Sequence, residues 1–194
     1  MQILMLSGSR NREGRTAQAI EAIAKGVAKA GGNSESIFLT ELAIERCRQC
    51  DKDGYGICIR EQRCIIKDDF DSVVTRVKAA DVVVFASPVY FLDLSESMRA
   101  FLERLRRTVP DSARSIPFSP HMGGTPAIGV CLAGKNGGGA LNCCVSLEKI
   151  IKECGFDVVD MIPLRRQNLE FKLPILALTG EWLVKKPTSG AFIP

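Results

Sequence analysis

The sequence predicts a doubly wound α/β fold with a five-stranded parallel sheet. Five short apolar runs lie along the 194 residues, and each except the last is followed by residues with a helical period. Such runs are typical of strands that are buried on both faces, as in parallel sheets. Strands that alternate with helices indicate right-handed crossovers, which leave few topologies. We expect the order 2-1-3-4-5, because it brings the loops after strands one, three and four to one binding crevice.

The expected strands cover residues 2–6, 35–39, 82–86, 127–132 and 158–162, and helical periods lie between them over about 17–27, 73–77, 94–105 and 141–151. Gly31 and Gly32 end the first helix, and Asp68 or Asp69 caps the second. In the third helix the apolar side chains share one face. The opposite face is expected to be solvated and to carry Arg99, Arg104, Arg106 and Arg107.

We expect residues 1–163 to form one domain, with a cysteine-containing loop at 46–67 inserted after the second strand. Residues 164–194 are expected to form a C-terminal extension, a helix and a loose tail, that packs on the domain or on a neighbouring subunit. The net charge of +4 is too small to indicate nucleic acid binding. No apolar run is long enough for a membrane span, and the first residues do not resemble a signal peptide, so we expect a cytoplasmic protein.

The first loop, Ser7–Thr16, has the composition of a phosphate-binding loop. It contains two glycines and three arginines, and it leads into a helix N-terminus, which favours an anion. It is not a P-loop, because the glycine spacing is one residue too long and Arg15 replaces the lysine. It is not a dinucleotide fingerprint either, because Arg10 replaces the second glycine. The alternative is a polar turn capped by Thr16.

The second and third loops favour a flat ligand. In Ser87–Phe91 a proline fixes the turn, and two aromatic side chains offer apolar contact. The alternative is a turn that feeds these aromatics into the core. The glycines at 134 and 137–139 let the backbone approach a ring closely. Together the three loops predict a ligand with a phosphate at one end and an aromatic system at the other, as in FMN.

These segments resemble the NADPH-dependent FMN reductase-like flavoproteins, which have a flavodoxin-like fold, and most closely their iron–sulfur flavoprotein branch. The resemblance covers about residues 1–162, and Cys64–Asp69 matches the end of the branch's cysteine motif. It implies that Ser9, Arg12, Arg15 and Thr16 hold the phosphate of FMN and that Pro88, Val89, Tyr90, Phe91, Gly137 and Gly138 cradle its ring, with Ser7, Asn11, Ala17 and Gly134 completing the site. Two positions depart from the branch, which often has asparagine in place of Arg15 and glycine after the aromatic pair, where this chain has Leu92.

Four cysteines, Cys47, Cys50, Cys58 and Cys64, lie within eighteen residues in a segment without helical or strand period. Clustered thiols of a cytoplasmic protein more often bind metal or undergo redox chemistry than form disulfides. The resemblance implies a [4Fe–4S] cluster, although the branch's motif has five residues fewer between the second and third cysteine. Zinc, a Cys47–Cys50 redox dithiol and buried structural cysteines are the alternatives. The other four cysteines are expected to be structural, and His121 is expected at the surface or in a subunit contact.

The resemblance implies an FMN-dependent oxidoreductase that moves electrons between NAD(P)H or a ferredoxin-type donor and a small acceptor, such as a quinone, nitroaromatic, flavin or oxygen species. No side chain is expected to be a catalytic acid or base, because the flavin carries the chemistry. The alternatives are a one-electron carrier without NAD(P)H activity and a zinc-stabilised flavodoxin-like interaction or sensor protein. A homo-oligomer, a dimer or a dimer of dimers, is expected from apolar residues outside the core: Ile116, Phe118, Leu169, Phe171, Leu173, Leu176 and Leu178.

Overall fold

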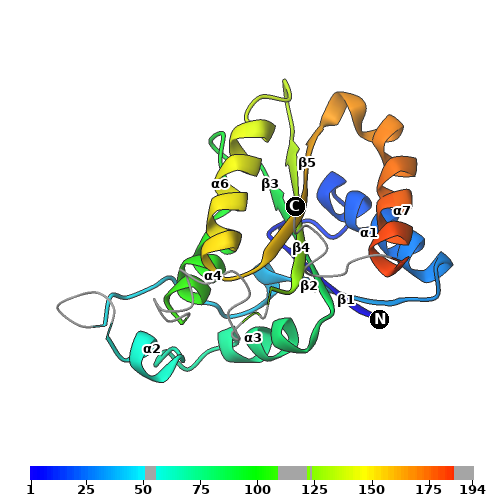
Figure 1. Ribbon diagram of the computed structural model, residues 1–194. Coiled ribbons are helices and arrows are strands. Elements are labelled where there is room, and N and C mark those ends of the chain that lie inside the picture. The colour runs from blue at the N-terminus through cyan, green and yellow to red at the C-terminus, as the bar shows by residue number, and fades with distance from the viewer. Residues whose placement is uncertain (51–55, 109–121, 123, 186–194) are drawn as a thin grey trace, which may run out of the picture.

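A five-stranded sheet forms the centre of the molecule (Figure 1), seen in a computed structural model that describes residues 1–50, 56–108, 122 and 124–185. The strand order is β2-β1-β3-β4-β5 and every pairing is parallel, so the predicted fold and order are confirmed. The strands are β1 (Gln2–Ser7), β2 (Asn33–Phe38), β3 (Val82–Pro88), β4 (Pro126–Ala133) and β5 (Asp157–Arg165). Because all strands run the same way, the loops after them gather at one edge of the sheet.

Helices cover both faces of the sheet. They are α1 (Arg15–Lys29), α2 (Gly56–Glu61), α3 (Phe70–Ala79), α4 (Glu96–Arg107), α6 (Ala140–Glu153) and α7 (Leu169–Lys185), with 3₁₀ turns η1 (Leu39–Glu41) and η2 (Arg166–Asn168). The prediction of a cysteine loop without helix is wrong at α2, whose six residues are too few to show a period. No helix in the described parts of the chain is long and apolar enough to cross a membrane.

Two apolar cores follow from the alternation of side chains along the strands. Val83 and Phe85 of β3 face α3, α4 and α6, whereas Val82 and Val84 face α1 and α7. Figure 1 shows the same division of the helices between the two faces. Both faces of β3 are therefore buried, as its apolar sequence predicted.

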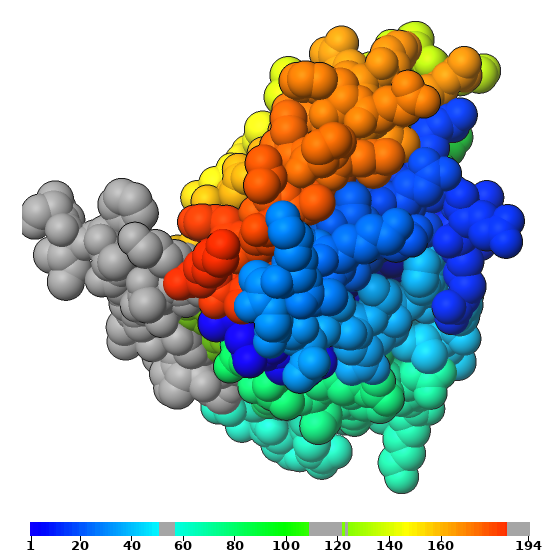
Figure 2. Space-filling view, turned by 90° about the vertical axis from the view of Figure 1, so that its right-hand side faces the viewer, coloured from blue at the N-terminus to red at the C-terminus, as the bar shows by residue number. Residues whose placement is uncertain are grey.

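The C-terminal helix α7 belongs to the fold of this chain, where it lies side by side with α1 (Figure 2). Leu169, Leu176 and Leu183 are buried against the sheet face that α1 covers. The expectation that Leu169 and Leu176 are left for another subunit is therefore wrong, whereas Phe171 and Leu178 are exposed. Residues 116, 118 and 121, on which other expectations fell, lie outside the described residues.

Helix α6 turns its cysteines inward. Cys143 and Cys144 are buried, while Leu141 and Val145 at the start of the helix are exposed. Hydrogen bonds with Cys143 and Cys144 raise the pKa of Cys131, which lies opposite them on β4. The Cys131 thiol therefore stays protonated in the core, and the burial of all three cysteines agrees with the prediction that they are structural.

Candidate functional site

The first loop is joined to β3 and to the start of α4 at the carboxyl edge of the sheet. The Gly8 amide donates to the Ala86 carbonyl at 2.9 Å, and the Ser97 hydroxyl donates to the Gly8 carbonyl at 3.2 Å. A Cβ on Gly8 would lie 2.1 Å from Ser95 Oγ, so the backbones can approach this closely only because residue 8 is glycine. The loop after β1 and the start of α4 thus form one unit.

The first loop folds its polar side chains onto its own backbone. The Ser9 amide donates to Ser7 Oγ and the Asn11 amide donates to Ser9 Oγ, both at 3.2 Å, and the Glu13 amide donates to Asn11 Oδ1 at 2.8 Å. This turn delivers the chain to the N-terminus of α1, where the first amides have no acceptor within the helix. There Thr16 is buried and Arg15 exposed. The N-terminus and its dipole favour an anion at this point.

Two of the arginines in the first loop are held by carboxylates. Arg10 pairs with Glu96 at 2.7 Å, and Arg12 pairs with Glu41 and lies over the Phe38 ring. The hydrogen bond from Arg12 lowers the pKa of Glu41, which stays ionised. Both pairs lie at the rim of the loop, so an anion that used these guanidiniums would compete with the carboxylates.

The second loop is a tight turn with an exposed apolar tip. Tyr90 and Asp93 exchange two backbone hydrogen bonds of 2.9 Å, and between them Phe91 and Leu92 have φ angles of 48° and 66°. This left-handed region costs a residue with a side chain about 1–2 kcal/mol. Phe91 is completely exposed and Tyr90 is 39% exposed, so the alternative that both feed the core is wrong.

The third loop lies against the second. Gly139 has a φ of 85°, and a Cβ there would lie 2.7 Å from Leu92 Cα. The Val89 amide donates to the Leu132 carbonyl at 2.9 Å, which holds the start of the second loop to the end of β4. A Cβ on Gly134 would meet nothing within 4 Å, so the backbone is accessible there. The structure thus brings all three predicted loops together.

Two open cavities flank the Arg10–Glu96 pair. One is enclosed by Gly8, Arg10, Leu39, Thr40, Glu41, Leu42, Ile44, Tyr90, Ser95, Glu96 and Ser97, and the other by Arg10, Val89, Tyr90, Phe91, Asp93, Leu94, Glu96 and Arg99. Thr40 donates to the Ser9 carbonyl at 2.9 Å, which ties the loop after β2 to the first loop. No sequence motif singled out Thr40, Ser95 and Ser97, although small hydroxyl residues after a strand or before a helix are typical of such edges.

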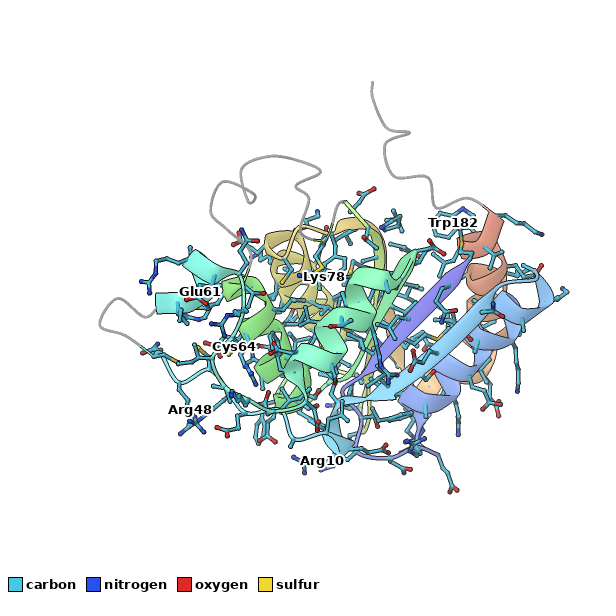
Figure 3. The ribbon with its side chains drawn as sticks, turned by 90° about the horizontal axis from the view of Figure 1, so that it is seen from below. Arg10, Arg48, Glu61, Cys64, Lys78 and Trp182 are labelled. Atoms are coloured by element: carbon cyan, nitrogen blue, oxygen red, sulfur yellow. The ribbon has the colours of Figure 1, made fainter. Side chains whose placement is uncertain are left out.

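The four clustered cysteines line one cavity. Cys47, Cys50, Cys58 and Cys64 share it with Arg48, Ile57, Ile65, Ile66, Arg104 and Arg107, and Figure 3 shows Cys64 beside α4, on the same side of the molecule as Arg48 and Glu61. Burial raises the pKa of Cys58, so a bound metal would displace a proton there. In the part of the chain that the structure describes, no three Cys, His, Asp or Glu side chains are grouped as ligands of a single metal ion.

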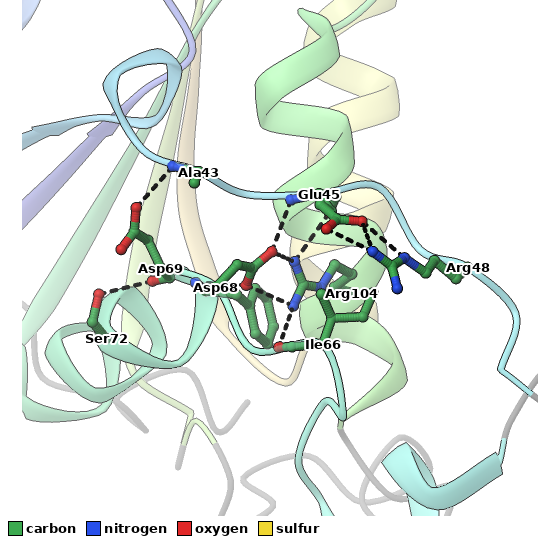
Figure 4. A network of polar contacts seen from close by, with 9 residues as sticks. Ala43, Glu45, Arg48, Ile66, Asp68, Asp69, Ser72 and Arg104 are labelled. Atoms are coloured by element: carbon green, nitrogen blue, oxygen red, sulfur yellow. Dashed lines mark hydrogen bonds and ion pairs between the residues drawn. The ribbon is translucent and has the colours of Figure 1, made fainter.

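Arg104 anchors both ends of the cysteine segment (Figure 4). Its Nη1 donates to Asp68 Oδ2 at 2.6 Å and to the Glu45 carbonyl at 3.0 Å, and its Nη2 donates to Asp68 Oδ1 at 3.0 Å and to the Ile66 carbonyl at 3.4 Å. The guanidinium lies 4.2 Å from the centre of the Phe70 ring. Burial raises the pKa of Asp68, but the hydrogen bonds from Arg104 and from backbone amides outweigh burial, and the pKa is lowered.

The predicted solvated face of arginines on α4 is therefore wrong in part. Arg104 is 1% exposed and Arg107 is 9% exposed, whereas Arg99 is exposed and pairs with Asp93. A buried guanidinium needs a carboxylate partner, and Asp68 supplies it from a segment far away in the sequence. Residue 104 comes one helical turn after the buried Phe101 and lies on the same buried face of α4.

A parallel sheet in this order, with an anion-favouring turn and two loops open to a flat ligand at its carboxyl edge, defines a flavodoxin-like protein. The chain belongs to the NADPH-dependent FMN reductase family, whose model matches residues 1–165. The predicted family is thereby confirmed.

Curated relatives carry the name of the predicted branch. An iron-sulfur flavoprotein of Archaeoglobus fulgidus is 28% identical over 54% of this chain and 46% of its own length, and one of Methanocaldococcus jannaschii is 29% identical over 71% of this chain and 65% of its own. The matched part thus spans less than two thirds of either relative. The solved NAD(P)H:quinone oxidoreductase from Methanothermobacter marburgensis shares the fold, with a TM-score of 0.71, 19% identity and coverage of 94% of this chain and 96% of that one.

Proposed function

We propose that this chain is an FMN-dependent oxidoreductase, which moves electrons between NAD(P)H or a ferredoxin-type donor and a small acceptor. The observation that supports it most is the meeting of the three loops at one sheet edge, with the N-terminus of α1 at one end and the loops 89–92 and 134–139 at the other. Bound FMN would supply the hydride and electron chemistry.

The residues of the first loop fit a phosphate group. The N-terminal amides of α1 would donate to its oxygens, with hydroxyl donors from Ser9 and Thr16. Arg15, exposed at the first position of α1, would add a positive charge. Arg12 would have to leave Glu41 to reach the same group, so its assignment as a phosphate ligand depends on that exchange.

The second and third loops fit a flat ring. Tyr90 and Phe91 are exposed at the tip of the second loop, so their faces are available for apolar contact. Gly134 and Gly138 are exposed and have room around them, and the Gly138 amide donates to Asn136 Oδ1 at 3.3 Å. These residues would orient the ring and exclude water from one of its sides, and no described side chain is assigned a proton-transfer role.

The phosphate assignment is tested with FMN and riboflavin, which differ only by the phosphate. Because a hydrogen bond to a charged group contributes about 1.5–3 kcal/mol, Ser9→Ala and Thr16→Ala should each weaken FMN binding by about 10- to 150-fold and riboflavin binding very little. Ser36→Ala, at an exposed position of β2, is the matched control and should leave both affinities unchanged. Equal losses for FMN and riboflavin would contradict the assignment.

A second function, one-electron transfer through a [4Fe–4S] cluster, is supported by the four cysteines around one cavity and by the names of the relatives. Anaerobic reconstitution with iron and sulfide should give a broad visible absorbance, which Cys→Ser changes at positions 47, 50, 58 or 64 should diminish. Uptake of about one zinc and no iron would instead indicate that the cysteines form a structural zinc site. Reduction by NADPH alone would favour the enzyme, and reduction only through a protein donor would favour the carrier.

We further propose a homo-oligomer, a dimer or a dimer of dimers. Exposed apolar side chains on α6 and α7 support it, among them Leu141, Val145, Phe171 and Leu178. A monomeric mass at micromolar concentration in solution would contradict it. The division at residue 163 and the cytoplasmic location remain predictions from the sequence.

A further inference from the structure

Arg104, which lines the cysteine cavity, has a buried donor without an acceptor among the described residues. Both terminal nitrogens of Arg104 donate hydrogen bonds. Its Nε–H, in contrast, is buried and has no hydrogen-bond partner within the described parts of the chain. Leaving such a donor unsatisfied has a free-energy cost. The cavity that Arg104 lines is also the one that the four cysteines line. An acceptor that occupied the cavity would remove this cost.

The four thiols have suitable chemistry for such an acceptor and line the same cavity. Burial lowers the pKa of Arg104, but hydrogen bonds with Asp68 and Cys64 outweigh it and leave the pKa above its ordinary value. Arg104 therefore stays charged in the cavity that the four cysteines line. Thiolate and sulfide sulfur both accept hydrogen bonds, and donors to the sulfurs help to set the potential of an iron–sulfur cluster.

We propose that Arg104 raises the reduction potential of a cluster bound by Cys47, Cys50, Cys58 and Cys64, and that Asp68 moderates this effect. The proposal rests on the [4Fe–4S] cluster of the preceding section. Reduction adds one electron, given by the titrant, and no proton to a group that is already anionic. A guanidinium that is 1% exposed stabilises the added negative charge with little screening by water, whereas the carboxylate of Asp68 opposes it.

The opposite charges of Arg104 and Asp68 predict shifts of the reduction potential in opposite directions. If Arg104 and Asp68 only held the loop in place, variants at the two positions would have equivalent effects, since each variant removes the same ion pair. An electrostatic role makes them opposite, because one charge favours the reduced cluster and the other disfavours it. Arg48 also lines the cavity, but its side chain is 59% exposed and it pairs with Glu45, so it provides the matched control.

The test is a redox titration of anaerobically reconstituted protein, followed by absorbance and electron paramagnetic resonance. Arg104→Met should lower the midpoint potential enough to change the ratio of reduced to oxidised cluster at least tenfold, a shift of about 59 mV. Asp68→Asn, which keeps an oxygen acceptor for Arg104, should raise the potential. Arg48→Met should shift it much less than Arg104→Met does.

If Arg104→Met does not fold, Arg104→Lys keeps the charge but loses the planar fork, and it should lower the potential by a smaller amount. Shifts of the same sign in the Arg104 and Asp68 variants, or no shift in either, would overturn the proposal. Wild-type protein that binds FMN but takes up no iron would overturn it too, while the proposed flavin function would stand.

Discussion

Replacing Gly8 by alanine tests whether the first loop and the start of α4 form one rigid site. The new Cβ would lie 2.1 Å from Ser95 Oγ and 3.1 Å from Met98 Cβ. Neither neighbour can turn into solvent, because Ser95 is 1% exposed and Met98 is fully buried. Overpacking of this kind costs about 1–3 kcal/mol. Gly8→Ala should therefore lower the free energy of unfolding by that amount.

The same displacement should reach the proposed FMN site. The loop that follows Gly8 leads directly to the N-terminus of α1, so a shift of the loop moves the amides that would hold the phosphate. If the whole cost appears in binding, the affinity for FMN falls by about 5- to 150-fold. Urea denaturation measures the first effect, and quenching of FMN fluorescence measures the second.

Ser95→Ala removes the atom that causes the clash. The hydroxyl makes only long contacts, 3.4 Å to Ser87 Oγ and 3.5 Å to Ser97 Oγ, so Ser95→Ala alone should cost at most about 1 kcal/mol. In the Gly8→Ala background it should restore most of the lost stability, with a coupling energy of about 1–3 kcal/mol. Wild-type behaviour of Gly8→Ala in both assays would contradict the predicted clash. So would a Gly8→Ala defect that Ser95→Ala leaves unchanged.

Two further variants test the packing. Gly26→Ala should lower the free energy of unfolding, measured by urea denaturation, by about 1–3 kcal/mol. The reason is that its Cβ would lie 1.8 Å from the Ala177 carbonyl oxygen of α7. Gly134→Ala is the control, because its Cβ would meet nothing within 4 Å. Leu92→Gly should stabilise the chain by about 1 kcal/mol in thermal unfolding, because glycine relieves the positive φ, whereas Leu92→Ala keeps the strain. A gain from alanine as large as that from glycine would attribute the effect to the lost side chain instead.

The sheet could be predicted from the sequence because its strands are buried on both faces. An apolar run such as Val82–Ala86 is too short for a typical helix and fits a buried strand, and Pro88 marks the end of that strand. The three loops followed from the same reasoning, because topology alone brings the carboxyl ends of parallel strands together. Leu92 was noted as a departure from the branch's glycine, and its φ of 66° shows that the chain keeps the glycine-like backbone at that position.

The buried ion pair could not be predicted in the same way. Arg104 and Asp68 are 36 residues apart, and each has a common local explanation, a solvated helix face for the arginine and a helix cap for the aspartate. Only the packing of α4 against the cysteine segment brings them together. Likewise, nothing local predicts whether Leu176 packs on α1 or on another subunit, since an apolar side chain fits either surface.

The two ends of the cysteine segment are fixed to each other, which has a consequence for how such proteins diverge. Arg104 binds the Glu45 and Ile66 carbonyls, and Ala43 and Asp69 exchange further hydrogen bonds, so the chain between is a closed loop on a rigid base. Lengthening such a loop from about 15 to 20 residues costs only roughly 0.3 kcal/mol in closure entropy. Insertions between Cys50 and Cys58 are thus nearly neutral for folding, and cysteine spacing can drift while the base is kept. Distant members of the family would then be recognised better by an aspartate shortly after the last cysteine, together with the arginine of α4, than by the intervals between cysteines.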